Sequence, residues 1–240
     1  LLVQYTDVKF SSSDPKGNFE ERLNGEHYTD EGGYGSIRQY FMDQSEGKFR
    51  PKFDAIGPVT LSHEMKYYGG NDKEGVDLRP REMVSEACRR AYSELNTDFA
   101  RYDNNGDGYV DIVYVIYAGY GEASYPDKLE NTVWPHQWQL ETPLTLGGVK
   151  IGRYACNNEL DGYSGNRLDG IGTFCHEFSH CLGLPDFYDT AGGDGFGMSV
   201  WSVMDYGCYN NDGHTPCGYT AYEKSFLGWT SLVELTNPTH

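Results

Sequence analysis

The sequence predicts an α+β fold: a twisted mixed sheet with a backing helix, a second helix that carries the polar residues of interest, and a small irregular lobe. Residues 112–117 are apolar on both faces, as in a central strand. Apolar side chains recur at helical spacing over residues 83–99. The C-terminal part of the chain is rich in glycine and aspartate. We therefore expect one unit made of an N-terminal lobe, residues 1–183, and a C-terminal lobe, residues 184–240.

The N-terminal lobe is predicted to begin with a strand at 1–10, followed by a long polar loop. A helix is expected over 36–47, because Ser36 can cap it and apolar side chains follow at i, i+3 and i+4 spacing. A second strand is expected at 53–61 and a loop at 67–75.

The remaining elements follow from hydrophobic periodicity and from turn residues. They are a long helix from Pro80, the central strand at 112–117, a loop-rich stretch at 122–143, a strand at 149–156, a helix at 169–182 and a short helix at 219–227.

Charge and hydropathy exclude two classes of partner. The chain has 240 residues, a formal net charge of −17 at pH 7 and a pI near 4.7. No basic stripe is available to neutralise phosphates, which argues against nucleic acid. No apolar run approaches the roughly 20 residues needed to span a bilayer. Because the chain begins Leu1-Leu2-Val3 rather than with Met, we expect a processed piece with a leader and a pro-segment upstream.

The most informative stretch runs from Gly172 to Asp186. Read as a helix that ends at Gly183, it places His176 and His180 one turn apart on the same face. Two imidazoles so placed can both reach one zinc ion at about 2.0–2.1 Å. Glu177 follows the first histidine, so its carboxylate can reach a water held on that metal. This H-E-x-x-H arrangement is typical of zinc peptidases.

Asp186 is the expected third ligand. It lies ten residues after His176, and Gly183 permits a sharp turn while Pro185 stiffens the exit from the helix. Three protein ligands leave a fourth position for water, as in catalytic zinc sites. The alternative is a buried helix whose histidines donate to backbone carbonyls, but that alternative must also explain the charge of Glu177.

A narrower resemblance extends over nearly the whole chain. The string from His176 to Asp189 resembles the immune inhibitor A family of secreted bacterial metallopeptidases. The other stretches that carry the resemblance are 7–10, 35–41, 103–111 and 222–229. The resemblance implies a metzincin-like catalytic domain with Asp186 in place of a third histidine, a pro-segment upstream and β-rich modules downstream.

Met204 and Tyr206 extend this resemblance. They lie 18 and 20 residues beyond Asp186 and resemble the Met-turn of the metzincins, in which a methionine lies beneath the metal site. By that resemblance Tyr206 is expected to donate a hydrogen bond to the oxyanion or to touch the zinc. Taken alone the pattern is weak, and a core methionine beside a loop tyrosine is the alternative.

A candidate calcium loop precedes the central strand. Side-chain oxygens at positions 1, 3, 5 and 9, a glycine at position 6 and a backbone carbonyl at position 7 match the start of an EF-hand-type loop. Position 12 is Tyr114 rather than Glu, so another acidic residue would have to complete the shell. The alternative is an Asp/Asn/Gly turn without an ion. The expected ligands are Asp103, Asn105, Asp107, Tyr109 and Asp111, with Asp189 and Asp194 as candidates for a second ion.

Six cysteines fit neither a metal knuckle nor a dense disulfide scaffold. Cys208 and Cys217 could form a disulfide, and free buried thiols are the alternative. The histidines outside the motif are expected at the surface or with satisfied hydrogen bonds, and His136 and His214 are the two that could line a cleft.

Together these features predict a secreted zinc endopeptidase with protein or peptide substrates. Glu177 is expected to take a proton from the attacking water and pass it to the leaving amine. Zinc, helped by Tyr206, is expected to stabilise the oxyanion. The substrate is expected to lie extended, as an added strand on an edge strand at 149–156. Two rivals stay open. One is a zinc hydrolase of another clan with a distant Glu as third ligand, for which Glu223 and Glu234 are the only Glu residues after His180. The other is a non-proteolytic binding or adhesive module that zinc and calcium stabilise.

Overall fold

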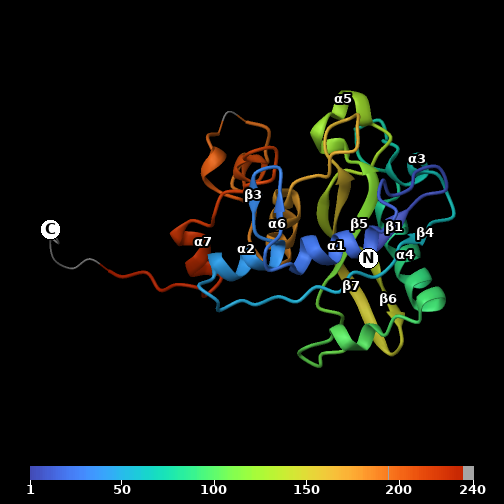
Figure 1. Cartoon of the computed structure of the whole chain (residues 1–240), viewed down its shortest axis with the longest axis horizontal. Coiled ribbons are helices and arrows are strands. Elements are labelled where there is room, and N and C mark those ends of the chain that lie inside the picture. The colour runs from blue at the N-terminus through green and yellow to red at the C-terminus, as the bar shows by residue number, and fades with distance from the viewer. Residues whose placement is uncertain (194, 235–240) are drawn as a thin grey trace.

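A five-stranded sheet forms the centre of the protein, with helices packed on both faces (Figure 1). The computed structural model describes residues 1–193 and 195–234. Four neighbouring strands run parallel and the last is antiparallel, so the predicted mixed sheet is confirmed. In spatial order the strands are β4 (Val59–Thr60), β1 (Leu2–Gln4), β5 (Val113–Tyr120), β7 (Val149–Leu160) and β6 (His136–Leu146).

Helices and one small hairpin surround the sheet (Figure 1). Among the described residues, no helix is long and apolar enough to cross a bilayer. The helices are α1 (Pro15–Asn24), α2 (Ile37–Gln44), α3 (Met65–Gly69), α4 (Pro80–Leu95), α5 (Pro126–Leu129), α6 (Ile171–Cys181) and α7 (Ala221–Phe226), and the hairpin pairs β2 (Thr29–Asp30) with β3 (Gly33–Tyr34).

Strand β5 is buried on both faces, as its apolar run predicts. Val115 and Tyr117 join the core on the α4 side of the sheet, while Ile116 and Ala118 join the core on the α6 side. The strand extends beyond the expected 112–117 and ends at Tyr120, directly before Gly121, and its pairing with β7 becomes irregular after Tyr117. It therefore separates two hydrophobic layers and connects the helices that cover them.

Helix α4 is the expected backing helix, but it is shorter than the apolar stripe suggests. Pro80 occupies its first turn, and the buried side chains of its apolar face pack against the sheet. Asn96 adopts a left-handed conformation with φ of 52°, which ends the helix. Phe99, expected at the end of the same helix, instead lies in a separate 3₁₀ turn.

Three expectations for the N-terminal part are wrong. The polar loop before Ser36 contains α1, which begins where the Asp14 side chain accepts the Gly17 N–H and Pro15 occupies the first turn. The strands expected at 1–10 and 53–61 shorten to β1 and β4, and the loop expected at 67–75 begins inside α3.

The sheet edge also differs from the expectation. Strand β7 lies between β5 and β6, so 149–156 is interior and β6 is the edge strand. Most of β6 falls in the stretch 122–143 that the sequence predicts to be loop-rich, because Leu140 is the one buried side chain of β6 and the strand lacks a strong apolar alternation. An exposed edge strand leaves little hydrophobic signal in the sequence.

The C-terminal part consists mainly of loops and short helical turns, as expected. Thr220 and Glu223 form a capping box that starts α7. Met204, Cys208 and Trp229 join the same core as α6, so this part of the chain packs directly against the helix that carries the histidine motif (Figure 1). The division into two lobes at residue 183 stays a prediction.

Candidate active site

Helix α6 places the histidine motif against the C-terminal segment. A Cβ added to Gly172 would come within 1.8 Å of the Cys208 carbonyl oxygen, so glycine permits the close packing at the first turn of the helix. At the other end, Gly183 has φ of 104° and turns the chain sharply, as its position predicts. The turn leads Asp186 back toward the two histidines.

Three donor atoms converge beyond the surface of α6. The Nε2 atoms of His176 and His180 are 3.2 Å apart, and Asp186 Oδ1 lies 3.3 Å from each of them. Tetrahedral zinc with bonds of about 2.0–2.1 Å requires donors about 3.3–3.4 Å apart, so the spacing fits this metal. Within residues 1–193 and 195–234, no other group of three His, Cys, Asp or Glu side chains brings its donor atoms so close together.

Backbone carbonyls fix the orientation of both imidazoles. His176 Nδ1 lies 2.8 Å from the Val203 carbonyl oxygen, and His180 Nδ1 lies 2.8 Å from that of Leu184. Because each Nδ1–H donates to a carbonyl, the lone pair of each Nε2 points toward Asp186. Asp186 Oδ1 is itself buried and without a hydrogen-bond donor. Three electron-rich atoms therefore face one another, an arrangement that a cation stabilises. Histidines bonded only for structural reasons would not explain it.

Charge coupling within the triad is strong. Burial lowers the pKa of His176, but the neighbouring Asp186 outweighs this effect and holds it well above its usual value. For Asp186, burial raises the pKa, yet the two neighbouring histidines keep it well below its usual range.

Glu177 lies beside the triad on the next position of α6. Its side chain is buried and lines the cleft, and burial raises its pKa to about 7, with the two histidines acting in the opposite direction. The backbone N–H of Gln137, on β6, also stabilises the carboxylate. A carboxyl with a pKa near neutrality can both accept and return a proton.

The cleft, of about 760 Å³, runs between β6, α6 and the C-terminal segment. Tyr206 lines it with Tyr209, is 64% exposed, and its backbone N–H donates to Asp205. His136 also lines this cleft. His214 does not: it is buried, with Nδ1 3.4 Å from Asp30 Oδ2.

Met204 is fully buried in the α6-side core. Its carbonyl accepts the Phe187 N–H at 2.8 Å, and the preceding residue, Val203, holds His176. One short segment therefore supports both the helix and the chain that carries Asp186. Whether it is a Met-turn in the metzincin sense stays a prediction.

Two residues near the triad escaped sequence reasoning. Burial and the neighbouring Asp186, to which its hydroxyl donates, raise the pKa of Tyr188 to about 12. Cys208 lines the cleft and hydrogen-bonds with His176. The spacing Asp186-x-Tyr188 could have indicated Tyr188, because residues i and i+2 of a turn often share polar contacts. Nothing in the sequence pattern connects Cys208 with His176.

The candidate calcium ligands do not converge on one point in the same way. Asp103 accepts the N–H groups of Asp107 and Gly108, and Asp107 accepts that of Tyr109. The Asn105 side-chain oxygen also accepts the Asp107 N–H, and Asp111 accepts the Asn104 amide. These bonds are those of an Asx-type turn, so calcium stays a prediction without support from the described residues. Asp189 accepts the N–H groups of Ala191 and Gly195, and Asp194 lies outside the described residues.

Two further expectations are resolved. Glu223 is buried, and its carboxylate accepts the Ser202 hydroxyl and the Thr220 N–H, so it is not the third member of the triad. All six cysteines are free, and the pairing of Cys208 with Cys217 is not formed.

Comparison with known proteins assigns the chain to a family. The model described as immune inhibitor A peptidase M6, catalytic domain, matches residues 10–231. The chain belongs to this family. The resemblance inferred from the sequence is thereby confirmed, and with it the expectation of a metallopeptidase at the level of the family.

Relatives agree with this assignment. Immune inhibitor A of Bacillus thuringiensis subsp. alesti is 29% identical over 98% of this chain, which spans 41% of that protein. Pre-pro-metalloprotease PrtV of Vibrio cholerae is 29% identical over 95% of this chain, which spans 27% of that protein. An Arthroderma benhamiae protein named as a secreted metallopeptidase is 22% identical over 74% of the chain and is covered over 30% of its length. The chain therefore spans well under half of the relatives it matches.

Proposed function

We propose that this chain is the catalytic domain of a secreted zinc endopeptidase. The observation that carries the proposal is that three potential metal-ligand atoms, from His176, His180 and Asp186, converge in an open cleft. The buried carboxyl of Glu177 lies beside them. Membership of a peptidase family supports the reaction class. Zinc bound by the triad would supply a Lewis acid and lower the pKa of a water at the fourth position.

Glu177 is the proposed general base. It takes a proton from the attacking water on its carboxylate and returns that proton to the leaving amine. Its burial raises the pKa to about 7, which suits a group that both accepts and donates a proton. Tyr188 orients Asp186 through its hydroxyl. Tyr206, which is exposed in the same cleft, is the proposed donor of a hydrogen bond to the developing oxyanion.

The substrate is proposed to bind as an extended strand along β6. No described strand pairs with the outer edge of β6, and the first residues of this strand form a wall of the cleft. Backbone groups on that edge can therefore pair with a peptide, as in other β-augmentation complexes. This proposal replaces the expected edge strand at 149–156.

The surroundings of the domain are also proposals. Secretion is supported by the printed name of the Arthroderma relative, and a pro-segment by the printed name of PrtV. Downstream modules are consistent with the small share of each relative that this chain covers.

The proposal is tested by cleavage of unfolded casein and of a mixed peptide set with the zinc-loaded protein. We expect cleavage that a chelator abolishes and that added zinc restores. The Glu177→Gln variant should retain zinc and lose activity. If the zinc-loaded protein cleaves no polypeptide, the binding-module alternative is favoured.

A further inference from the structure

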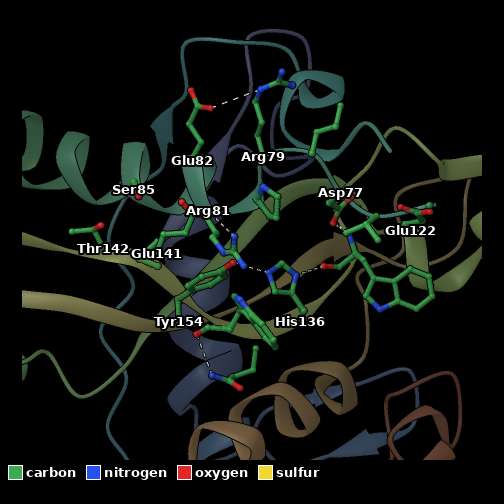
Figure 2. A pocket seen from close by; sticks show the side chains of 18 of the residues that line it. Asp77, Arg79, Arg81, Glu82, Ser85, Glu122, His136, Glu141, Thr142 and Tyr154 are labelled. Atoms are coloured by element: carbon green, nitrogen blue, oxygen red, sulfur yellow. Dashed lines mark hydrogen bonds and ion pairs between the residues drawn. The ribbon is translucent and has the colours of Figure 1, made fainter. Parts of the chain in front are cut away.

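A second pocket, of about 950 Å³, lies beside β6 on the side of the sheet that α4 covers (Figure 2). The loop at 75–79 and the start of α4 form one wall, and His136 and Trp138 of β6 form the other. Tyr154, from the core on the α4 side, lies between the walls. The segment 134–138 borders both this pocket and the catalytic cleft. The two cavities are therefore neighbours, separated by the beginning of the edge strand.

The alternation of β-strands connects this pocket with the cleft. In an extended peptide, successive side chains point to opposite faces of the sheet. On β6, His136 hydrogen-bonds with the Tyr154 hydroxyl, and Leu140 belongs with Tyr154 to the core on the α4 side. Positions 136, 138 and 140 therefore face α4, and the positions between them face the α6 side. A peptide paired with the outer edge of β6 places alternate side chains toward the α4 side. The second pocket lies where such a side chain would enter.

The charged groups of the pocket are unevenly distributed (Figure 2). At one end Arg81 Nη1 lies 2.8 Å from Glu141 Oε1, and nearby Arg79 lies 4.0 Å from Glu82. These arginines therefore already have carboxylate partners. Arg89 is eight residues further along α4 than Arg81, about 12 Å away by helix rise, and it is exposed.

Asp77 and Glu122 occupy the other end and have no cationic partner (Figure 2). Asp77 Oδ2 accepts the Trp134 N–H at 2.9 Å, whereas its Oδ1 is buried without a donor. Glu122, 5% exposed, accepts the Asn71 amide at 2.7 Å. Neither carboxyl forms an ion pair with any residue that the structure describes. Burial raises the pKa of Asp77 to about 7 and raises that of Glu122 as well, because no positive charge offsets desolvation.

The walls leading to these carboxyls are apolar and exposed. Trp134 is 45%, Trp138 53% and Leu78 50% exposed, although each is a large hydrophobic side chain. An apolar channel that ends in carboxylates matches a side chain with a long aliphatic stem and a terminal cation. The Trp134 indole adds a cation–π contribution for such a group, whereas the Trp138 ring already has the Arg81 guanidinium 6.0 Å from its centroid.

We propose that this pocket binds a lysine or arginine side chain of a peptide aligned on β6, and so determines sequence preference. The inference rests on the proposed peptidase function for its biological meaning, but the pocket itself can be tested without catalysis. Asp77 and Glu122 supply the charge, and Trp134 and Trp138 enclose the stem of the bound side chain.

The first experiment measures kcat/KM for matched fluorogenic peptides that carry lysine or norleucine at each position in turn. Norleucine keeps the stem without the charge. We expect one position at which lysine is preferred by about tenfold or more, the scale of one charge-assisted hydrogen bond. Asp77→Asn and Glu122→Gln should reduce this preference toward unity. Glu94→Gln, an exposed change of equal charge on α4, is the matched control and should retain the preference.

The second experiment measures binding of the same labelled peptides to Glu177→Gln by fluorescence anisotropy. The lysine peptide should bind about tenfold more tightly than the norleucine peptide, and the Asp77→Asn change should remove the difference. If the lysine peptide binds more tightly but the wild-type protein cleaves no peptide, the peptidase function is refuted and the pocket assignment stays intact. Cleavage with no preference for lysine or arginine at any position, or a preference for acidic residues, would overturn the pocket assignment alone.

Discussion

Replacing Glu177 with glutamine should remove activity and, in the metal-free protein, increase stability at alkaline pH. The side chain is 7% exposed, and burial raises its pKa from 4.5 to about 7. Between about pH 4.5 and 7 the native protein retains a proton that the unfolded chain has released. Stability therefore falls as pH rises across this interval. The shift of roughly 2.5 pKa units corresponds to about 3 kcal/mol lost by pH 8.

The glutamine variant lacks this titration. At pH 5 it should be about as stable as the wild type, and at pH 8 it should be more stable by about 3 kcal/mol, or roughly 6–12 °C in Tm for a chain of this size. The difference should shrink when zinc is added, because a nearby cation favours the ionised carboxylate of the wild type. Peptide cleavage should fall by about 10²–10⁴-fold, the usual contribution of a general base.

Thermal unfolding of both proteins after chelation, followed by circular dichroism at pH 5 and pH 8, measures this effect. Glu94→Gln, which removes an exposed carboxylate, should change stability by less than about 0.5 kcal/mol at both pH values. If the difference in stability between the glutamine variant and the wild type is the same at pH 5 and at pH 8, the burial argument is refuted. Retained activity in the variant would remove Glu177 from the mechanism.

Three further predictions concern the supports of the site. Tyr188→Phe removes the hydroxyl that donates to Asp186, so the zinc Kd measured by competition with a chromophoric chelator should rise about 10–100-fold without loss of fold; an unchanged Kd would mean that Tyr188 does not orient this ligand. Met204→Ala opens a cavity at a fully buried position and should lower the free energy of unfolding, measured in urea, by about 2–5 kcal/mol. A decrease below about 1 kcal/mol would mean that Met204 does not support the site by packing beneath it. Millimolar calcium should raise Tm in the wild type and not in Asp107→Asn, because binding to the native state adds stability; an unaltered wild-type Tm would identify the 103–111 loop as a turn without an ion.

The candidate triad could be predicted from sequence because its geometry is local. Helix periodicity places His176 and His180 one turn apart, and the glycine at 183 determines where the chain reverses, so Asp186 follows. The central strand and the backing helix were predictable for a related reason. Each buries a long apolar face, and that burial leaves a clear periodic signal.

What escaped prediction depends on contacts between distant segments. Strand β6 is an edge strand with one fully buried side chain, so its sequence resembles a loop. Helix α1 has few apolar residues, although its cap, Asp14, and Pro15 were visible in the sequence. Cys208 reaches His176, and Asp77 reaches the backbone of Trp134, only through the tertiary fold. The second pocket is built from such contacts, and no spacing rule indicates it.

The most direct test of the central claim is a zinc-edge anomalous diffraction measurement on crystals of the zinc-loaded protein. The account predicts a single strong peak in the cleft, about 2.0–2.2 Å from Nε2 of His176, Nε2 of His180 and Oδ1 of Asp186, with a fourth position open to water. A peak elsewhere, or a third protein ligand other than Asp186, would contradict it.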